Sequence, residues 1–203
     1  MSLTLACELV AQHADFLPLS AVAQLRVDLR YATAANFMQR NMYSPLDCAW
    51  AHRDAVAGLT RAAAWLAHEQ PGVQLCVLDA LRPQRVQEAM WAALEGTPLT
   101  DYLAPPERGS IHSFGMAIDA TLIDADGHEL DMGTSFDDMT ELSHPALEMH
   151  FLNAGALSAQ QISHRHLLRN AMRHGGFSGI NTEWWHFDCG DRAQVRASYA
   201  RVL

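Results

Sequence analysis

The sequence lacks long hydrophobic runs and has little positive charge, and both absences exclude classes of protein. No stretch contains the roughly 18 uninterrupted apolar residues that a membrane-spanning helix needs, so we expect no membrane partner. The N-terminal segment has no basic region, and Glu8 interrupts its apolar run, which does not match a secretory signal peptide. The formal charge of −9, from 14 basic and 23 acidic residues, argues against a nucleic-acid partner, because such partners bind positively charged surfaces.

Cysteine is also scarce. The four cysteines lie far apart and form no Cys-x-x-Cys pair: Cys7, Cys48, Cys76 and Cys189. This spacing indicates buried thiols in a reduced, cytoplasmic protein rather than a disulfide framework.

The chain length favours one domain. The 203 residues are enough to bury a core, and no repeat, linker or low-complexity segment divides them. We therefore expect a single domain spanning residues 1–203. The oligomeric state stays open, a homo-oligomer included.

Three segments have the pattern of amphipathic helices. Apolar residues recur at intervals of three and four from residue 51 to about 69 and from 84 to about 94. Ser158 is a candidate N-cap for a third helix, which extends to about residue 174.

Four segments are predicted to contain strands: residues 27–32, 73–80, 111–122 and 181–188. The turn residues 124–127 indicate a hairpin whose return arm begins at His128. Residues 131–157 have a mixed pattern, and residues 132–138 within them are expected to be irregular. The sequence thus predicts an α+β fold, in which a mainly antiparallel sheet carries the functional site and helices flank it.

Two distant stretches contain residue types that bind divalent metals. His112 and Asp119 lie in the first, His186 lies in the second, and Glu183 is a spare carboxylate near His186. Catalytic zinc sites typically use three protein ligands and leave a position for water, which fits this set. Gly115 would let the first stretch turn back so that its two ligands converge. In a flat strand, however, Glu183 and His186 would point to opposite faces, so the spacing leaves an ordinary structural role open.

Other candidate residues have an ordinary interpretation as well. The eleven histidines include His164, His166 and His174 on the third predicted helix, which we interpret as a solvent-exposed face. Arg82 lies between a predicted strand and a helix, where it is either a surface arginine or a fixed cation near the metal. Tyr31 fits a half-buried aromatic residue of a strand.

The two metal-binding stretches form a known pair of motifs. Ser-x-His-x-x-Gly-x-Ala-x-Asp at residues 110–119, followed by Glu-Trp-Trp-His at 183–186, resembles the signature of the zinc D-Ala-D-Ala peptidases. Within that group, the chain most resembles the D-alanyl-D-alanine dipeptidases. The resemblance extends over nearly the whole chain, with matching blocks at residues 27–37, 81–85, 132–137 and 143–144.

This resemblance implies the α+β fold of the hedgehog and D-Ala-D-Ala-peptidase group. It implies zinc-dependent hydrolysis of the dipeptide D-Ala-D-Ala to two D-alanines, with one zinc ion per chain held by His112, Asp119 and His186. It also implies that Glu183 is the catalytic acid and base and that Arg82 stabilises the developing oxyanion.

The resemblance further implies how the substrate, a small-molecule dipeptide, is held. Asp137 and Tyr31 would bind its free amino group, and Ser110 would also contact it. The loop at residues 96–109 departs from the family pattern, which leaves the pocket shape and the tolerance for residues other than D-Ala open. The physiological role is open too: recycling of wall dipeptide, glycopeptide resistance and clearance of D-dipeptides use the same chemistry.

Three alternatives remain. The nearest is a related zinc carboxypeptidase or endopeptidase that cleaves peptidoglycan stem peptides. Two histidines and a carboxylate also form the facial triad of iron(II) oxygenases, although those enzymes usually space the two ligand types more closely. The third is a metal-bearing binding module without activity, and the presence of both Glu183 and Arg82 argues against it.

Overall fold

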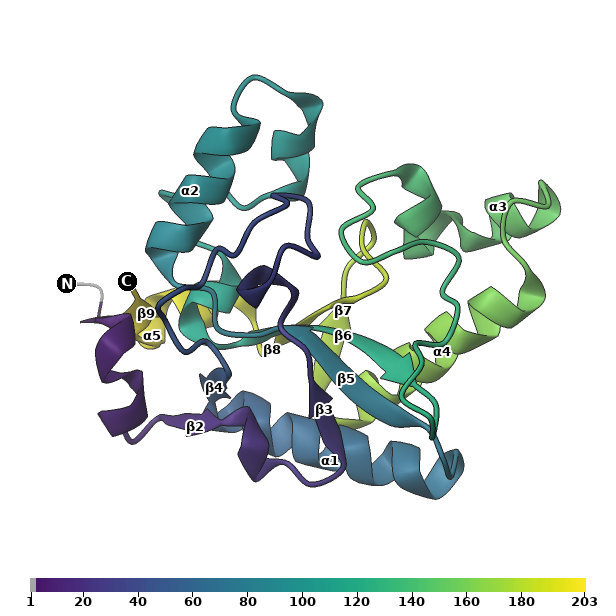
Figure 1. Ribbon diagram of the computed structural model, residues 1–203, viewed down its shortest axis with the longest axis horizontal. Coiled ribbons are helices and arrows are strands. Elements are labelled where there is room, and N and C mark those ends of the chain that lie inside the picture. Colours follow the sequence, from purple (N-terminus) through teal and green to yellow (C-terminus); the bar gives the residue numbers. More distant parts are fainter. Residues whose placement is uncertain (1–2) are drawn as a thin grey trace.

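A five-stranded sheet lies at the centre of the computed structural model, which describes residues 3–203 (Figure 1). Its strand order is β3-β5-β6-β8-β7, with the bounds Leu25–Val27 (β3), Gln74–Asp79 (β5), Ala117–Ile123 (β6), Phe177–Gly179 (β7) and His186–Cys189 (β8). β5 pairs antiparallel with β6, β6 with β8, and β8 with β7, whereas β3 runs parallel to β5. The predicted α+β fold with a mainly antiparallel sheet is confirmed.

Two small strand pairs lie outside this sheet. β1 (Thr4–Leu5) pairs in parallel with β9 (Arg201–Val202), which places the two ends of the chain close together (Figure 1). β2 (Phe16–Pro18) pairs antiparallel with β4 (Trp50–His52), directly before the first helix. These strands were not predicted, because two or three residues carry too little alternation to be recognised.

The α-helices are α1 (Arg53–Glu69), α2 (Gln84–Leu94), α3 (Glu148–Asn153), α4 (Ala159–His174) and α5 (Arg192–Ser198). Short 3-10 helices occupy Cys7–Gln12, Leu19–Ala21, Arg30–Ala32, Pro98–Tyr102, Ile111–Phe114, Glu141–Ser143 and Pro145–Leu147. Within residues 3–203, no helix combines the length and the apolar character that crossing a lipid bilayer requires.

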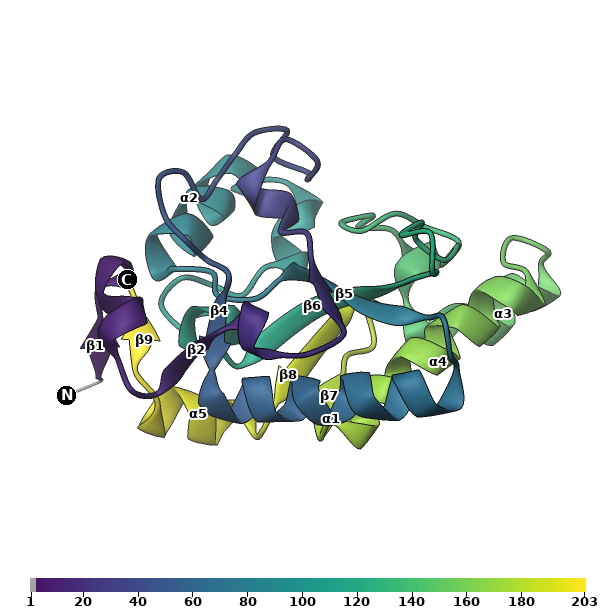
Figure 2. The same cartoon turned by 60° about the horizontal axis from the view of Figure 1, so that its bottom comes forward.

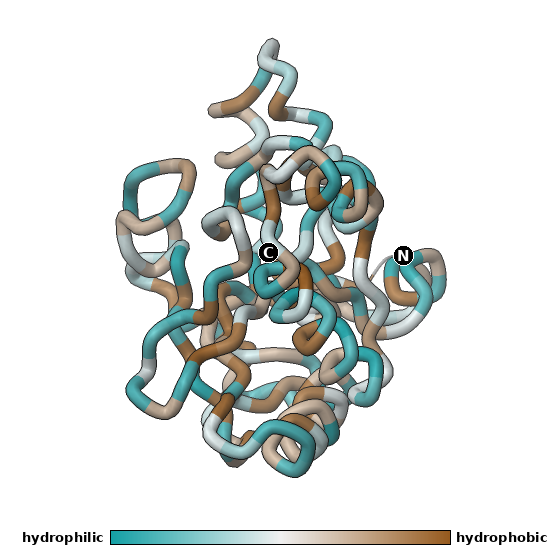
Figure 3. The backbone as a smooth tube through the Cα atoms, turned by 90° about the vertical axis from the view of Figure 1, so that its right-hand side faces the viewer, coloured by the Kyte–Doolittle hydropathy of each residue, from teal (hydrophilic) through white to brown (hydrophobic). Residues whose placement is uncertain are grey.

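α1 and α4 pack side by side against one face of the central sheet (Figure 2). The stripe that α1 buries is the predicted one: Ala55, Leu59, Ala62, Ala63 and Leu66. It shares a core with Ile118 and Ala120 of β6. Figure 3 shows hydrophobic and hydrophilic residues alternating along the chain. Gly58 permits the close contact of the two helices, because a Cβ atom there would lie 2.9 Å from the carbonyl oxygen of Gly175.

The three predicted helices are confirmed. α2 and α4 have their predicted bounds, and α1 begins slightly later than predicted because the residues before it belong to β4. Ser158 caps α4 as expected. Its Oγ accepts a hydrogen bond from the backbone N–H of Gln161 at 3.1 Å, and Gln161 Oε1 accepts one from the N–H of Ser158 at 2.8 Å. This reciprocal arrangement is a capping box.

Three other predictions are wrong in part. The strand predicted at 27–32 ends at Val27, and the chain then turns so that Tyr31 packs among Phe37, Tyr43 and Phe136. The strand predicted at 181–188 is regular only from His186, because the preceding residues form the connection between β7 and β8. The predicted return arm at His128 is a single bridge rather than a strand. Residues 132–138 are irregular as predicted, and the remainder of the mixed segment 131–157 contains α3.

Candidate active site

Strand register brings three of the site residues into one row. Asp79 of β5 pairs with Asp119 of β6, and Asp119 pairs in turn with His186 of β8. A bulge between Val77 and Asp79 shifts the pairing at this point, so that Asp79 shares a face with Asp119. Ile118 belongs to the core beneath the sheet, so this row points to the face away from α1 and α4.

His112 reaches the row from a short 3-10 helix between β5 and β6. Ser110 caps this helix, and its Oγ accepts a hydrogen bond from the N–H of His112 at 3.3 Å. Gly115 ends it with a φ of 65°, and a Cβ atom there would lie 2.7 Å from the backbone nitrogen of His52. The predicted glycine turn is therefore present, and it requires glycine for both its conformation and its space.

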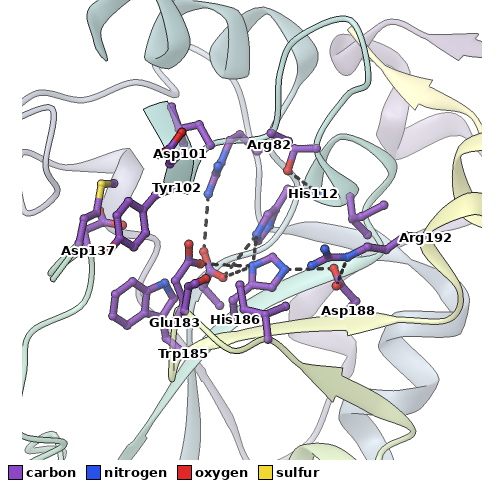
Figure 4. A pocket seen from close by; sticks show the side chains of 18 of the residues that line it. Arg82, Asp101, Tyr102, His112, Asp137, Glu183, Trp185, His186, Asp188 and Arg192 are labelled. Carbon is purple, nitrogen blue, oxygen red and sulfur yellow. Dashed lines mark hydrogen bonds and ion pairs between the residues drawn. The ribbon is translucent and has the colours of Figure 1, made fainter. Parts of the chain in front are cut away.

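Three side-chain atoms converge at the row (Figure 4). His112 Nε2 lies 3.2 Å from His186 Nδ1 and 3.4 Å from Asp119 Oδ1, and the last two atoms are 3.0 Å apart. A tetrahedral ion with bonds of about 2.0–2.1 Å needs ligand atoms about 3.3 Å apart. The donor set and its spacing therefore fit a metal such as zinc.

Neighbouring groups hold both imidazole rings. Nδ1 of His112 lies 2.9 Å from the carbonyl oxygen of Ala80, which orients Nε2 toward the other ligands. His186 Nε2 lies 3.0 Å from Asp188 Oδ1, so a carboxylate supports this ring from behind. Burial alone would lower the pKa of His186, but hydrogen bonds to Asp119 and Asp188 outweigh it and raise the pKa to about 10. The same carboxylates would favour a metal cation in place of a second proton.

Glu183 lies beside the three converging atoms without joining them. Its Oε2 is 3.9 Å from His186 Nδ1, and the residue precedes the regular part of β8. The conflict expected for a flat strand is thus resolved, because Glu183 is outside the strand. Burial raises the pKa of Glu183 to about 7, although the neighbouring His186 opposes the shift.

Arg82 is a buried, fixed cation rather than a surface arginine. Asp79 Oδ2 accepts hydrogen bonds from its Nε at 2.9 Å and its Nη2 at 2.6 Å, and Gln87 Oε1 accepts one from Nη1 at 3.1 Å. The guanidinium lies over the ring of Tyr31, 4.9 Å from its centroid, and 3.6 Å from Asp119 Oδ2. Burial would lower the pKa of Arg82, but the charge of Asp79 outweighs it and keeps the arginine ionised.

Sequence reasoning missed four residues that support the site: Asp79, Gln87, Asp188 and Tyr43. The hydroxyl of Tyr43 donates a hydrogen bond to Asp79. Asp79 carried a usable signal, since it is a carboxylate at the end of an otherwise apolar strand and lies three residues before Arg82. Gln87 and Tyr43 carried none, because nothing in their local sequence distinguishes them from surface polar residues.

Asp137 and Tyr31 form a second polar group in the same pocket. Asp137 Oδ1 accepts a hydrogen bond from the Tyr31 hydroxyl at 2.9 Å, and Oδ2 accepts one from the N–H of Phe37 at 3.4 Å. Asp137 has a φ of 63°, a left-handed conformation that aspartate tolerates better than most residues. Burial, followed by the charge of Asp119, raises its pKa to about 8. Tyr31 is only 1% exposed, so its interpretation as a half-buried strand residue is wrong.

The candidate site lines one cavity of about 180 Å³, small beside the roughly 300–1,000 Å³ of sites for drug-sized ligands. It brings together the eight residues singled out from the sequence: Tyr31, Arg82, Ser110, His112, Asp119, Asp137, Glu183 and His186. The loop at 96–109 supplies part of the wall, including Asp101 and Tyr102. His166 and His174 are exposed and His164 is half-buried, and none of the three lines the cavity, as predicted.

Comparison with known proteins assigns the family. A model of the D-Ala-D-Ala dipeptidases, peptidase family M15, matches residues 12–202. The chain belongs to this family. It is 38% identical over 164 residues to the D-alanyl-D-alanine dipeptidase of Escherichia coli, an alignment that covers 81% of this chain and 78% of the relative. It is 29% identical over 172 residues to a protein of the same name from Synechocystis, covering 66% of each.

Among solved structures, the LdcB LD-carboxypeptidase is similar with a TM-score of 0.48 and 13% identity, over 90% of this chain and 71% of that one. The family assignment makes the chain a peptidase-type hydrolase related to peptidoglycan metabolism. It favours hydrolysis over the iron(II) oxygenase chemistry that the same ligand types would also allow. The His-Asp-His group is the candidate metal site of this peptidase.

Proposed function

We propose that this chain is a zinc dipeptidase that hydrolyses D-Ala-D-Ala to two D-alanines. The observation that supports it is that Glu183 and Arg82, neither of them a ligand, share one small cavity with His112, Asp119 and His186. Zinc held by these three side chains would lower the pKa of a bound water to about 7 and polarise the scissile carbonyl.

Glu183 moves the protons in this proposal. Its carboxylate takes a proton from the attacking water and delivers it to the nitrogen of the leaving D-alanine, so that the C–N bond breaks with net addition of one water. The position of Glu183, in the cavity wall with its side chain 14% exposed and 3.9 Å from a ligand atom, suits a group that reaches the water and the nitrogen in turn.

Arg82 neutralises the negative charge that develops on the carbonyl oxygen. Asp79 and Gln87 hold the guanidinium from behind, so it does not need to reorganise during the reaction. The loss of one such oxyanion donor typically costs about 10²–10³ in rate.

Asp137 and Tyr31 recognise the free ammonium group of the dipeptide. Burial raises the pKa of Asp137 to about 8, and an adjacent ammonium would favour its ionised form. Substrate binding is therefore coupled to loss of a proton from Asp137. Ser110 accepts a hydrogen bond from His112, which leaves its hydroxyl hydrogen available to donate to the substrate.

The test compares D-Ala-D-Ala with N-acetyl-D-Ala-D-Ala, with zinc content measured in parallel. We expect rapid cleavage of the free dipeptide and cleavage of the acetylated one slowed by at least about 100-fold, because an acylated amine is neutral and leaves Asp137 without a cation. L-Ala-L-Ala serves as the stereochemical control. Equal rates for the free and acetylated substrates would contradict the dipeptidase proposal and favour a carboxypeptidase that acts on stem peptides.

A further inference from the structure

The cavity has a basic wall that none of the roles above uses. The chain contains no lysine, so its 14 basic residues are all arginines. Three of them, Arg108, Arg192 and Arg196, line the same cavity as the candidate metal ligands. A fourth, Arg201, lies directly behind this wall and donates a hydrogen bond to the backbone oxygen of Arg108 at 3.0 Å. A protein with a net charge of −9 therefore gathers arginines along one wall of its candidate active site.

Most of this charge has no carboxylate partner. Arg192 Nε donates to Asp188 Oδ2 at 2.5 Å, whereas Arg196 donates only to backbone oxygens, those of Gly109 and Arg192. The side chain of Arg108 makes no hydrogen bond or ion pair with any residue in the range 3–203. Three guanidinium groups against one carboxylate leave a local surplus of two positive charges. Burial, followed by repulsion from Arg108 and Arg192, lowers the pKa of Arg196, as expected where like charges are crowded.

The basic wall and the Asp137 group lie on opposite sides of the candidate metal ligands. In Figure 4, His112 and His186 are central, Asp137 lies to one side, and Arg192 lies to the other. The two sides also differ in their chemical groups, since the loop residue Asp101 adds a second carboxyl group on the side of Asp137, whereas the other side presents guanidinium groups. A cavity with carboxyl groups at one end and guanidinium groups at the other is complementary to a ligand with an ammonium at one end and a carboxylate at the other.

We propose that Arg108, Arg192 and Arg196 form a subsite for the C-terminal carboxylate of the substrate. This inference rests on the proposed function, because it places the scissile bond at the candidate metal site. In an extended dipeptide the carboxylate carbon lies about one residue, or 3.3–3.6 Å, beyond the scissile carbonyl. Arg192 is joined to the candidate metal site through a single carboxylate, because Asp188 contacts both His186 and Arg192.

With this subsite, both ends of the cavity limit the length of the substrate. Asp137 selects a free amine, and the arginines select a free carboxylate one peptide bond away. A tripeptide would place either its amine or its carboxylate out of reach, which leaves Asp137 or the arginines without a partner.

The experiment measures hydrolysis of D-Ala-D-Ala and of its C-terminal amide, which lacks only the negative charge. The variants are Arg108→Gln, Arg196→Gln and the double variant. Arg192 is left intact because it contacts Asp188, which in turn supports His186. The matched control is Arg173→Gln on α4, an exposed arginine whose side chain contacts Asn170 at 2.8 Å and does not line the cavity.

Each single variant is expected to raise KM for the free acid by about threefold to fivefold, the effect of one partly exposed ion pair, and the double variant by about tenfold. KM for the amide and kcat for both substrates should change by less than about twofold, and Arg173→Gln should match the unaltered enzyme. An equal change in KM for acid and amide would overturn the subsite.

Calorimetry on zinc-loaded Glu183→Ala protein separates this inference from the proposed function. The acid is expected to bind more tightly than the amide, and the arginine variants should remove the difference. An acid that binds no more tightly than the amide, or a difference that survives in the double variant, would overturn the subsite whether or not the enzyme is active. Arginine-dependent binding without hydrolysis by the unaltered enzyme would overturn the proposed function and uphold the subsite.

Discussion

The two faces of the central sheet use the same strands but depend on different interactions. On the face covered by α1 and α4, Ile118 is fully buried among apolar neighbours. Asp119, the next residue, is 2% exposed on the other face, where it contacts His112 and His186. Apolar burial is non-directional, whereas a buried charge is tolerated only with its partner in place. Substitutions on the first face should therefore change stability, and those on the second should change chemistry.

The largest effect is expected from His186→Ala, compared with Glu183→Ala. Removing His186 should abolish both zinc binding and activity, because two ligands remain. Removing Glu183 should keep zinc and reduce kcat by about 10²–10⁴, the usual contribution of a general acid and base. Metal analysis and steady-state kinetics on both variants check this, and an active Glu183→Ala enzyme would refute the mechanism.

Arg82→Lys is the next test on the same face. Lysine keeps a cation beside Asp79 and so protects the fold, but it loses the fork-shaped contact with that carboxylate. We expect kcat to fall by about 10²–10³ while KM changes little. The thermal midpoint should fall by only a few degrees. A rate unchanged by the substitution would show that Arg82 does not contact the reacting oxygen.

Leu59→Ala tests the other face. Leu59 is fully buried on α1, and its truncation leaves a cavity at the contact with the sheet. The free energy of unfolding should fall by about 2–5 kcal/mol. Zinc content and KM should stay within error of the unaltered protein. Denaturant titration and kinetics on one preparation provide both measurements, and a large change in KM would show that the two faces are not independent.

The smallest effect concerns pH. Burial raises the pKa of Asp137 to about 8 from an ordinary value of 3.8, so between these values the unfolded chain binds fewer protons than the folded one. Asp137 therefore lowers stability as pH rises through this window. Asp137→Asn should be more stable than the unaltered protein at pH 8, with a smaller advantage at pH 5. Denaturant midpoints of metal-free samples check this, with the exposed Asp126→Asn as a control that should show no trend.

The sequence predicts the apolar face better than the polar one. The stripe of α1 repeats every three or four residues, so each position reinforces the others, and its burial was predictable. Among the partners of Arg82, only Asp79 carried a local signal, whereas Gln87 meets the guanidinium from the first turn of α2. Local patterns contain no information on this second contact.

The site itself was predictable mainly through motif resemblance. Residue types alone indicated three ligands and a spare carboxylate, but regular strand geometry set Glu183 and His186 on opposite faces. The structure removes this conflict by starting β8 at His186, a boundary that a run of aromatic residues concealed. Tyr31 shows the same limit, because its burial depends on a turn that alternation along the sequence could not reveal.

The paired row of Asp79, Asp119 and His186 has a consequence for how the protein folds. If β6 slipped by one residue against its neighbours, Asp119 would move to the face that α1 and α4 cover, and Ile118 or Ala120 would occupy its place in the cavity. A carboxylate enclosed there without a cation costs several kcal/mol or more. The row therefore favours the native alignment of the strands, because a chain with shifted register loses the charge pairing among these side chains.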